Sequence, residues 1–175
     1  MDVLDVGCGR KKDPVATVGM DAFALPGVDV VHDVLDFPWP FPDGSFDRLV
    51  SHQLIEHIPP GRAGQDPLLE FFDEAWRVLR PGGTFAFDTP HADSWYAYGD
   101  LTHRRYFVPY AFHVLWEFDP NSPYPRKMWA RESVRCDYTY RFAYHVKKHL
   151  PSLDRVLQRH RHGTPEFIYI VLRKP

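Results

Sequence analysis

The segment VLDVGCG at residues 3–9 is the feature that most constrains the fold of this chain. A short apolar run, residues 3–6, leads directly into a turn that contains Gly7 and Gly9. Such a run is typical of a strand buried within a sheet. Two glycines at its end let the backbone approach a ligand where side chains would block it. The sequence therefore predicts a buried first strand whose carboxyl end faces a binding site.

Apolar runs and connecting segments alternate through the first half of the chain. The runs expected to form strands are residues 3–6, 17–21, 28–33, 48–51 and 84–90. Three prolines make residues 37–47 irregular. Residues 68–79 show helical spacing, and the sequence Pro81-Gly82-Gly83 is expected to end that helix. The face of the helix is predicted to consist of Leu69, Phe72, Ala75, Trp76 and Leu79.

The last third of the chain has a different pattern. Residues 108–118 can form a helix. Residues 133–146 alternate strictly between apolar and polar side chains, with Val134 and Cys136 on the apolar side, and residues 165–174 form another apolar run. Period two over this length predicts long strands with one covered face. Together with the first half, this predicts an α/β, doubly wound, Rossmann-like, mostly parallel seven-stranded sheet with a C-terminal antiparallel strand pair.

Composition limits the class of protein. No apolar run approaches the roughly 20 residues of a membrane helix, and Cys8 and Cys136 are far apart, so we expect a cytoplasmic protein without disulfides or membrane contact. Residues 1–100 carry 17 acidic and 7 basic side chains, whereas residues 101–175 carry 6 and 14. The basic half either faces an acidic partner or attracts the acidic half within one fold.

In a parallel sheet the carboxyl ends of the strands meet at one edge, where ligands bind. The residues that follow the predicted strands are Gly7 to Arg10, Asp21, Asp33, Ser51, His52 and His91. Dinucleotides and S-adenosylmethionine are the two ligand classes that such an edge commonly binds. A dinucleotide fingerprint requires a third glycine, but Lys12 occupies that place. Asp21 follows Gly9 by twelve residues, where the fingerprint expects about 20.

The first half resembles the class I S-adenosylmethionine-dependent methyltransferases, in particular the small bacterial type (methyltransferase type 11-like). The matching segments are LDVGCG, VGMD, VDVVHDVLDFPWPFPDGSFDRLVSHQLIEHI and EFFDEAWRVLRPGGTFAFDTPH, which span roughly residues 3–91. The segment DLTHRRYFVPYAF is similar to one found after the fifth strand in a subset of these enzymes.

The resemblance implies a cofactor site for S-adenosylmethionine, with S-adenosylhomocysteine as product. Asp5 would support the amino-acid end, Asp21 the ribose hydroxyls, and Asp33 with Val34 the adenine. Ser51 and His52 would form the floor beneath the methionine part. The remaining residues expected at the site are Gly7, Cys8, Gly9 and Ala22, and no chemistry is assigned to Cys8.

We expect a single domain, residues 1–175. Residues 1–91 would bind cofactor, residues 92–132 would form an aromatic lid or substrate segment, and residues 133–175 would contain the strand pair. Methyltransferases of this class commonly begin with a helical segment that is absent here. The acceptor site is then either unusually open, covered by the 92–132 segment, or covered by a second copy of the chain in a homodimer, and truncation of the sequence at its N-terminus would produce the same absence.

The expected reaction is O- or N-methyl transfer to a small-molecule or glycan-like acceptor. His91 is the first candidate base and His103 the second, each with a structural role as the alternative, and His57 is expected to pack. Nucleic acid is a less favoured acceptor because SHQL stands where base methyltransferases carry their Asn/Asp-Pro-Pro-Tyr motif. No metal site is expected, because the sequence carries no HExxH motif and no cysteine pair. A catalytically silent cofactor-binding partner subunit and a dinucleotide-binding oxidoreductase stay open as alternatives.

Overall fold

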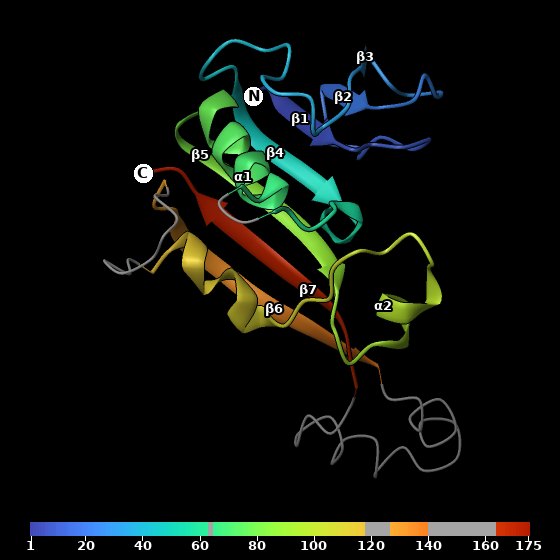
Figure 1. Ribbon diagram of the computed structural model, residues 1–175. Helices are drawn as coiled ribbons and strands as arrows, with labels where there is room; N and C mark the ends of the chain where they lie inside the picture. The colour runs from blue at the N-terminus through green and yellow to red at the C-terminus, as the bar shows by residue number, and fades with distance from the viewer. Residues whose placement is uncertain (63–64, 118–126, 140–163) are drawn as a thin grey trace, which may run out of the picture.

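The computed structural model describes residues 1–62, 65–117, 127–139 and 164–175. Seven strands form one sheet in the order β3-β2-β1-β4-β5-β7-β6 (Figure 1). Their bounds are β1 Val3–Val6, β2 Val18–Asp21, β3 Val30–Val31, β4 Phe46–His52, β5 Leu79–Pro90, β6 Ala130–Thr139 and β7 Thr164–Arg173. The first five strands pair in parallel, and β7 pairs antiparallel with both β5 and β6. The predicted fold class is confirmed.

The order of the strands reverses at β1. The chain passes from β1 outward to β2 and β3, and then returns to place β4 on the other side of β1. A reversal of this kind opens a crevice beyond the carboxyl ends of the strands, where open α/β sheets bind ligands. The crossovers among β1, β2 and β3 contain no helix, so loops form this side of the crevice.

Helix α1, residues Pro67–Val78, covers the sheet over β4 and β5 (Figure 1). Asp66 caps its N-terminus by accepting a hydrogen bond from the backbone N–H of Leu68 at 2.9 Å. The buried apolar face consists of Leu68, Phe71, Phe72, Ala75 and Val78, and the Phe71 and Phe72 rings pack against Phe85 of β5. The predicted face was therefore wrong at Leu69, whereas Trp76 is half-buried and packs against the core as predicted.

The helix ends at Val78 rather than at the Pro81-Gly82-Gly83 sequence, because Leu79 already pairs with Phe46 of β4. The next pair joins Arg48 to Thr84, so the residues between Leu79 and Thr84 bulge out of the ladder. Gly82 lies in this bulge with a φ of 78°. The strand resumes at the predicted residue 84.

The predicted helix at residues 108–118 is instead a 3₁₀ helix, η2, over Pro109–Leu115. Phe112 and Leu115 are its buried residues. In a 3₁₀ helix residues three apart lie on the same line, which places these two side chains together against the core. The third strand is also shorter than predicted, because only Val30 and Val31 pair with β2.

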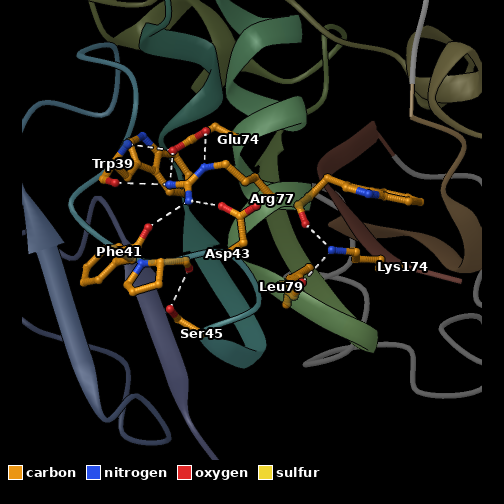
Figure 2. Close-up of polar contacts among 10 residues, drawn as sticks. Trp39, Phe41, Asp43, Ser45, Glu74, Arg77, Leu79 and Lys174 are labelled. Carbon is orange, nitrogen blue, oxygen red and sulfur yellow. Dashed lines mark hydrogen bonds and ion pairs between the residues drawn. The ribbon is translucent and has the colours of Figure 1, made fainter.

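The proline-rich segment after β3 is fixed to α1 by a partly buried ion pair (Figure 2). The Arg77 guanidinium donates to the Glu74 carboxylate, with Nη2–Oε1 at 2.6 Å and Nε–Oε2 at 2.9 Å. It also donates to the carbonyl oxygens of Trp39 and Phe41 at 3.1 and 2.8 Å. The Trp39 indole N–H in turn donates to the carbonyl of Val34. One arginine thus fixes the path of the chain next to the crevice.

The C-terminal strand pair is confirmed over the described residues. Val134 and Cys136 of β6 are half-buried, whereas Arg135 between them is exposed, as the alternation predicted. Predicted strand residues 140–146 lie outside the described residues. No helix in the described part of the chain is long and apolar enough to span a membrane.

Candidate functional site

The loop after β1 has the conformation that its glycines predicted. Gly7 and Gly9 have φ angles of 73° and 56°, which residues other than glycine rarely adopt. The backbone N–H groups of Gly7 and Cys8 both donate to the carbonyl of Met20 in β2. The N–H of Gly9 donates to Asp21 Oδ2 at 2.9 Å. The loop is thereby closed onto the end of β2.

A cavity of about 360 Å³ lies beyond the ends of β1, β2 and β3. This volume is within the range of small-molecule sites. Its polar lining comes from Asp21, Asp33 and His57, and its apolar lining includes Val34, Leu35 and Leu54. Of the predicted cofactor residues, the cavity is lined by Gly7, Asp21, Ala22, Asp33 and Val34.

The Asp21 carboxylate is held in place by the backbone. Its Oδ1 accepts from the N–H of Phe23 at 3.0 Å, and its Oδ2 accepts from Gly9. Each carboxylate oxygen can accept a second hydrogen bond. Asp21 therefore presents a fixed negative charge with remaining acceptor capacity at the cavity.

His52 belongs to a polar network beside this cavity. Its Nδ1 lies 2.5 Å from Asp88 Oδ1, and its Nε2 lies 3.0 Å from Asp13 Oδ2. Asp13 donates its backbone N–H to Asp5 Oδ2 at 2.7 Å. The hydrogen bond to Asp88 raises the pKa of His52 to about 9, so the ring is a cation at neutral pH. The network connects the ends of β5, β4 and β1.

Asp5 is almost completely buried under the glycine loop. Burial raises the pKa of its carboxyl. Its Oδ1 has no hydrogen-bond partner among the described residues. Ser51 and Cys8 are also buried, and the Ser51 hydroxyl donates to the carbonyl of Val6. Burial raises the pKa of the Cys8 thiol to about 11, so it is protonated.

A second cavity, of about 340 Å³, lies next to the first. It is lined by Gln53, His57, Trp95, Tyr96, Gly99, Asp100, His103 and Phe167. Trp95, Tyr96 and Gly99 belong to α2, residues Trp95–Gly99, and Phe167 belongs to β7. His57 lines both cavities, and its ring also packs edge to face against His103.

The two candidate bases occupy different surroundings. His91 is buried, and its Nδ1 accepts from the backbone N–H of Asp93 at 3.0 Å. It is in the lining of neither cavity. Burial lowers the pKa of His91, which is therefore neutral at neutral pH. His103 lines the second cavity and donates from Nδ1 to the carbonyl of Ala97 at 2.9 Å.

Glu56 lies beside His103 and was missed by the sequence reasoning. Its side chain is 1% exposed, and burial raises the pKa of its carboxyl to about 7. Its Oε1 is 4.0 Å from His103 Nε2. Glu56 and His57 are placed by η1, Ile55–His57, just after β4. The motif LIEHI contained both residues, but nothing in it indicated that His103 would lie beside them.

Part of the basic second half attracts the acidic first half. Arg105 forms an ion pair with Asp66 at 2.7 Å and donates to the carbonyls of Ile58 and Pro59. Lys174 donates to the carbonyls of Trp76 and Leu79 (Figure 2). These cations are engaged within the fold. Three further basic residues of the second half, Arg126, Lys147 and Lys148, lie outside the described residues.

The chain is similar to methyltransferases in sequence and in structure. Residues 10–87 match the sequence profile of the family described as methyltransferase domain. A probable S-adenosylmethionine-dependent methyltransferase of Mycolicibacterium smegmatis is 35% identical over 106 residues, and the match covers 51% of this chain and 38% of the relative. The chain thus spans well under half of the length of that curated relative.

Solved structures share the fold. A SAM-dependent methyltransferase from Archaeoglobus fulgidus superposes with a TM-score of 0.63 at 16% identity, covering 99% of this chain and 86% of that one. Phosphoethanolamine N-methyltransferase 2 of Haemonchus contortus, in complex with S-adenosyl-L-methionine, gives a TM-score of 0.55 at 13% identity, covering 100% and 49%. Residues 10–87 are thus similar in sequence to the methyltransferase domain family, and the chain shares the fold of solved S-adenosylmethionine-dependent methyltransferases.

Proposed function

We propose that this protein transfers a methyl group from S-adenosylmethionine to a hydroxyl or amine of a small-molecule or glycan-like acceptor. One observation carries the proposal: in a chain with a methyltransferase domain sequence, Gly7, Asp21 and Asp33 converge on one cavity at the reversal of the sheet. Identity to the curated relative and likeness of fold support the same activity.

The residues around the first cavity fit the cofactor. Asp21 offers acceptors for the ribose hydroxyls, and Leu25, Leu35 and Ile58 offer apolar walls for the adenine ring, with Asp33 at its edge. Asp5 Oδ1, buried and without a partner among the described residues, suits the amino-acid end. The bound cofactor would supply an activated methyl group on a sulfonium. Gly7 keeps the approach to it open, because the loop backbone there carries no side chain.

The second cavity is the proposed acceptor site. Aromatic rings of Trp95, Tyr96 and Phe167 form one side of it, and Gln53 and Asp100 offer hydrogen-bonding groups. Rings beside amide and carboxylate groups suit a sugar or another polyhydroxylated molecule, whose apolar face packs while its hydroxyls bond. His57 lies between this cavity and the first, which supports transfer from one to the other.

His103 is the stronger candidate for the base. Its Nδ1–H is committed to the carbonyl of Ala97, so its neutral ring carries the free lone pair on Nε2. A histidine so placed at the acceptor cavity can accept the proton that a hydroxyl or amine loses. His91 is buried away from both cavities, and its hydrogen bond with Asp93 supports a structural role.

The dinucleotide alternative is weakened by two features of the first loop. Residues 7–17 form turns and bends without a helix, so the loop offers no helix N-terminus to a pyrophosphate. Lys12, at the place of the third glycine, pairs with Asp29 at 2.6 Å. The silent-subunit alternative is not weakened, because such a subunit would keep the same cavity.

A turnover assay separates these functions. Formation of S-adenosylhomocysteine would be measured with sugars, aromatic hydroxyls and amines as acceptors, on the wild type, Asp21→Ala and the matched control Asp36→Ala, an exposed residue absent from the cavity lining. Turnover lost only in Asp21→Ala supports methyl transfer. Cofactor binding without turnover on any acceptor supports the silent subunit, and binding of NADH alone supports the oxidoreductase.

A further inference from the structure

Glu56, His57 and His103 form a cluster with the donor atoms of a metal site. One nitrogen of each imidazole and one carboxylate oxygen all lie within 4.8 Å of one another. The His57 and His103 rings meet edge to face, with centroids 4.7 Å apart. Two histidines and one glutamate are the ligand set of a common class of catalytic zinc site, which leaves further positions open to substrate.

The protons of the two histidines are placed as metal ligation requires. His103 donates from Nδ1 to the carbonyl of Ala97, which leaves its Nε2 lone pair free. Thr102 donates its hydroxyl to Asp100 Oδ1 at 2.6 Å and so accepts from His57 Nδ1 at 3.0 Å. His57 therefore also carries its lone pair on Nε2. Metal-binding histidines are typically oriented in this way, by an acceptor on the other ring nitrogen.

Glu56 is an unusual residue to bury without a cation. Its Oε2 accepts from the Thr89 hydroxyl at 3.1 Å, whereas its buried Oε1 has no hydrogen-bond partner among the described residues. His103 Nε2 lies 4.0 Å from Glu56 Oε1. This nitrogen has no proton to donate when the His103 ring is neutral, because the proton is on Nδ1. When Glu56 is ionised and His103 is neutral, two electron-pair donors therefore face each other at 4.0 Å.

We propose that Glu56, His57 and His103 bind one Zn²⁺ ion at the wall of the acceptor cavity, and that this ion, which then occupies the Nε2 lone pair of His103, replaces His103 in activating the acceptor hydroxyl. The second part rests on the proposed methyl transfer. Zinc bonds of about 2.0–2.1 Å place donor atoms about 3.3 Å apart in a tetrahedral site, so His103 Nε2 and Glu56 Oε1 would approach by about 0.7 Å.

A bound zinc ion explains how a weakly acidic hydroxyl could react at neutral pH. The acceptor oxygen would occupy an open coordination position, where the charge of the ion lowers its pKa. The hydroxyl proton would leave to solvent or to a carboxylate at the cavity, and the oxygen lone pair would form the new bond to the methyl carbon as the carbon–sulfur bond breaks. Asp100 lines the same cavity and holds Thr102, so it orients His57 from behind.

Zinc binding is tested without cofactor or acceptor. Metal-free protein is titrated with Zn²⁺ in a calorimeter, and with Co²⁺ while the visible absorption of the cobalt is recorded. The variants are Glu56→Gln, His57→Gln and His103→Gln. The matched control is His32→Gln, an exchange in an exposed loop, where His32 contacts the carbonyl of Asp36.

The proposal predicts one ion per wild-type chain, with at least 100-fold weaker binding in each of the three site variants and unchanged binding in the control. Intense cobalt absorption, typical of four-coordination, is expected only where binding is tight. Equal binding by the site variants, or binding by the wild type only at millimolar metal, would overturn it. Zinc binding with no affinity for S-adenosylhomocysteine would keep the metal site and refute the proposed function. Affinity for S-adenosylhomocysteine without zinc binding would refute the metal site and keep the proposed function.

Discussion

Gly7 packs against Leu54 more closely than any side chain would permit. A Cβ atom added at Gly7 would lie 2.8 and 2.9 Å from the two methyl carbons of Leu54, and the residue has a φ of 73°. Gly9 has a similar φ of 56°, but a Cβ atom there would have no neighbour within 4 Å. The two glycines therefore separate the cost of backbone conformation from the cost of a steric clash.

Gly7→Ala and Gly9→Ala should differ in stability by the cost of that clash. The left-handed conformation costs about 1–2 kcal/mol in either variant. Overpacking adds about 1–3 kcal/mol at Gly7 alone. We expect Gly7→Ala to lose about 3 kcal/mol, which in a domain of this size lowers Tm by about 6–12 °C. Gly9→Ala should lose only about 1–2 kcal/mol, the cost of the backbone conformation.

The assay is denaturant unfolding of both single variants, of Leu54→Ala and of the Gly7→Ala/Leu54→Ala double variant. Removing the Leu54 methyl groups should relieve the clash. The double variant should therefore lose about 1–3 kcal/mol less stability than the sum of the losses in the two single variants. Equal losses at Gly7 and Gly9, or strictly additive losses in the double variant, would refute the close approach of the loop to Leu54.

Three further predictions concern charged groups. Arg77→Met should lower the free energy of unfolding by about 3 kcal/mol in a denaturant titration, because it leaves the Glu74 carboxylate buried without its partner. The hydrogen bond to Asp88 raises the pKa of His52 to about 9, so the stabilisation that the charged ring gives to the folded state is complete below pH 6.5 and lost as the pH rises through 9. After discounting for the 55% exposure of the side chain, we expect this stabilisation to be about 1 kcal/mol and to be absent in His52→Gln. Burial raises the pKa of Glu56 to about 7, so the wild type loses stability as the pH rises through 7. Metal-free Glu56→Gln should be more stable than the wild type by about 2 kcal/mol at pH 8 and equal to it near pH 4.

The sheet could be predicted where each strand is buried by its own pattern. Residues 3–6 form β1 as predicted, and residues 17–21 form β2 to within one residue. The pattern failed where pairing decides the structure. Leu79 reads as the last residue of a helix, but its pairing with Phe46 makes it the first residue of β5. Residues 28–33 read as a full strand, but β2 offers partners only to Val30 and Val31.

The candidate site was predictable only in its cofactor half. Gly7, Asp21 and Asp33 each follow a strand, so the rule that ligands bind at the carboxyl ends brought them together. Glu56 and His103 lie side by side because the segment after β5 folds back, and no local sequence pattern predicts this contact. The His91 side chain is buried, although the strand that it follows ends at the expected edge.

The most direct test of the account is calorimetric titration of the protein with S-adenosylhomocysteine. We predict one site per chain in the wild type and in Asp36→Ala. Asp21→Ala should bind about 10- to 100-fold more weakly, because it loses hydrogen bonds to a charged acceptor worth about 1.5–3 kcal/mol each. Absence of binding in the wild type, or equal affinity in Asp21→Ala, would contradict the assignment of the first cavity as the cofactor site.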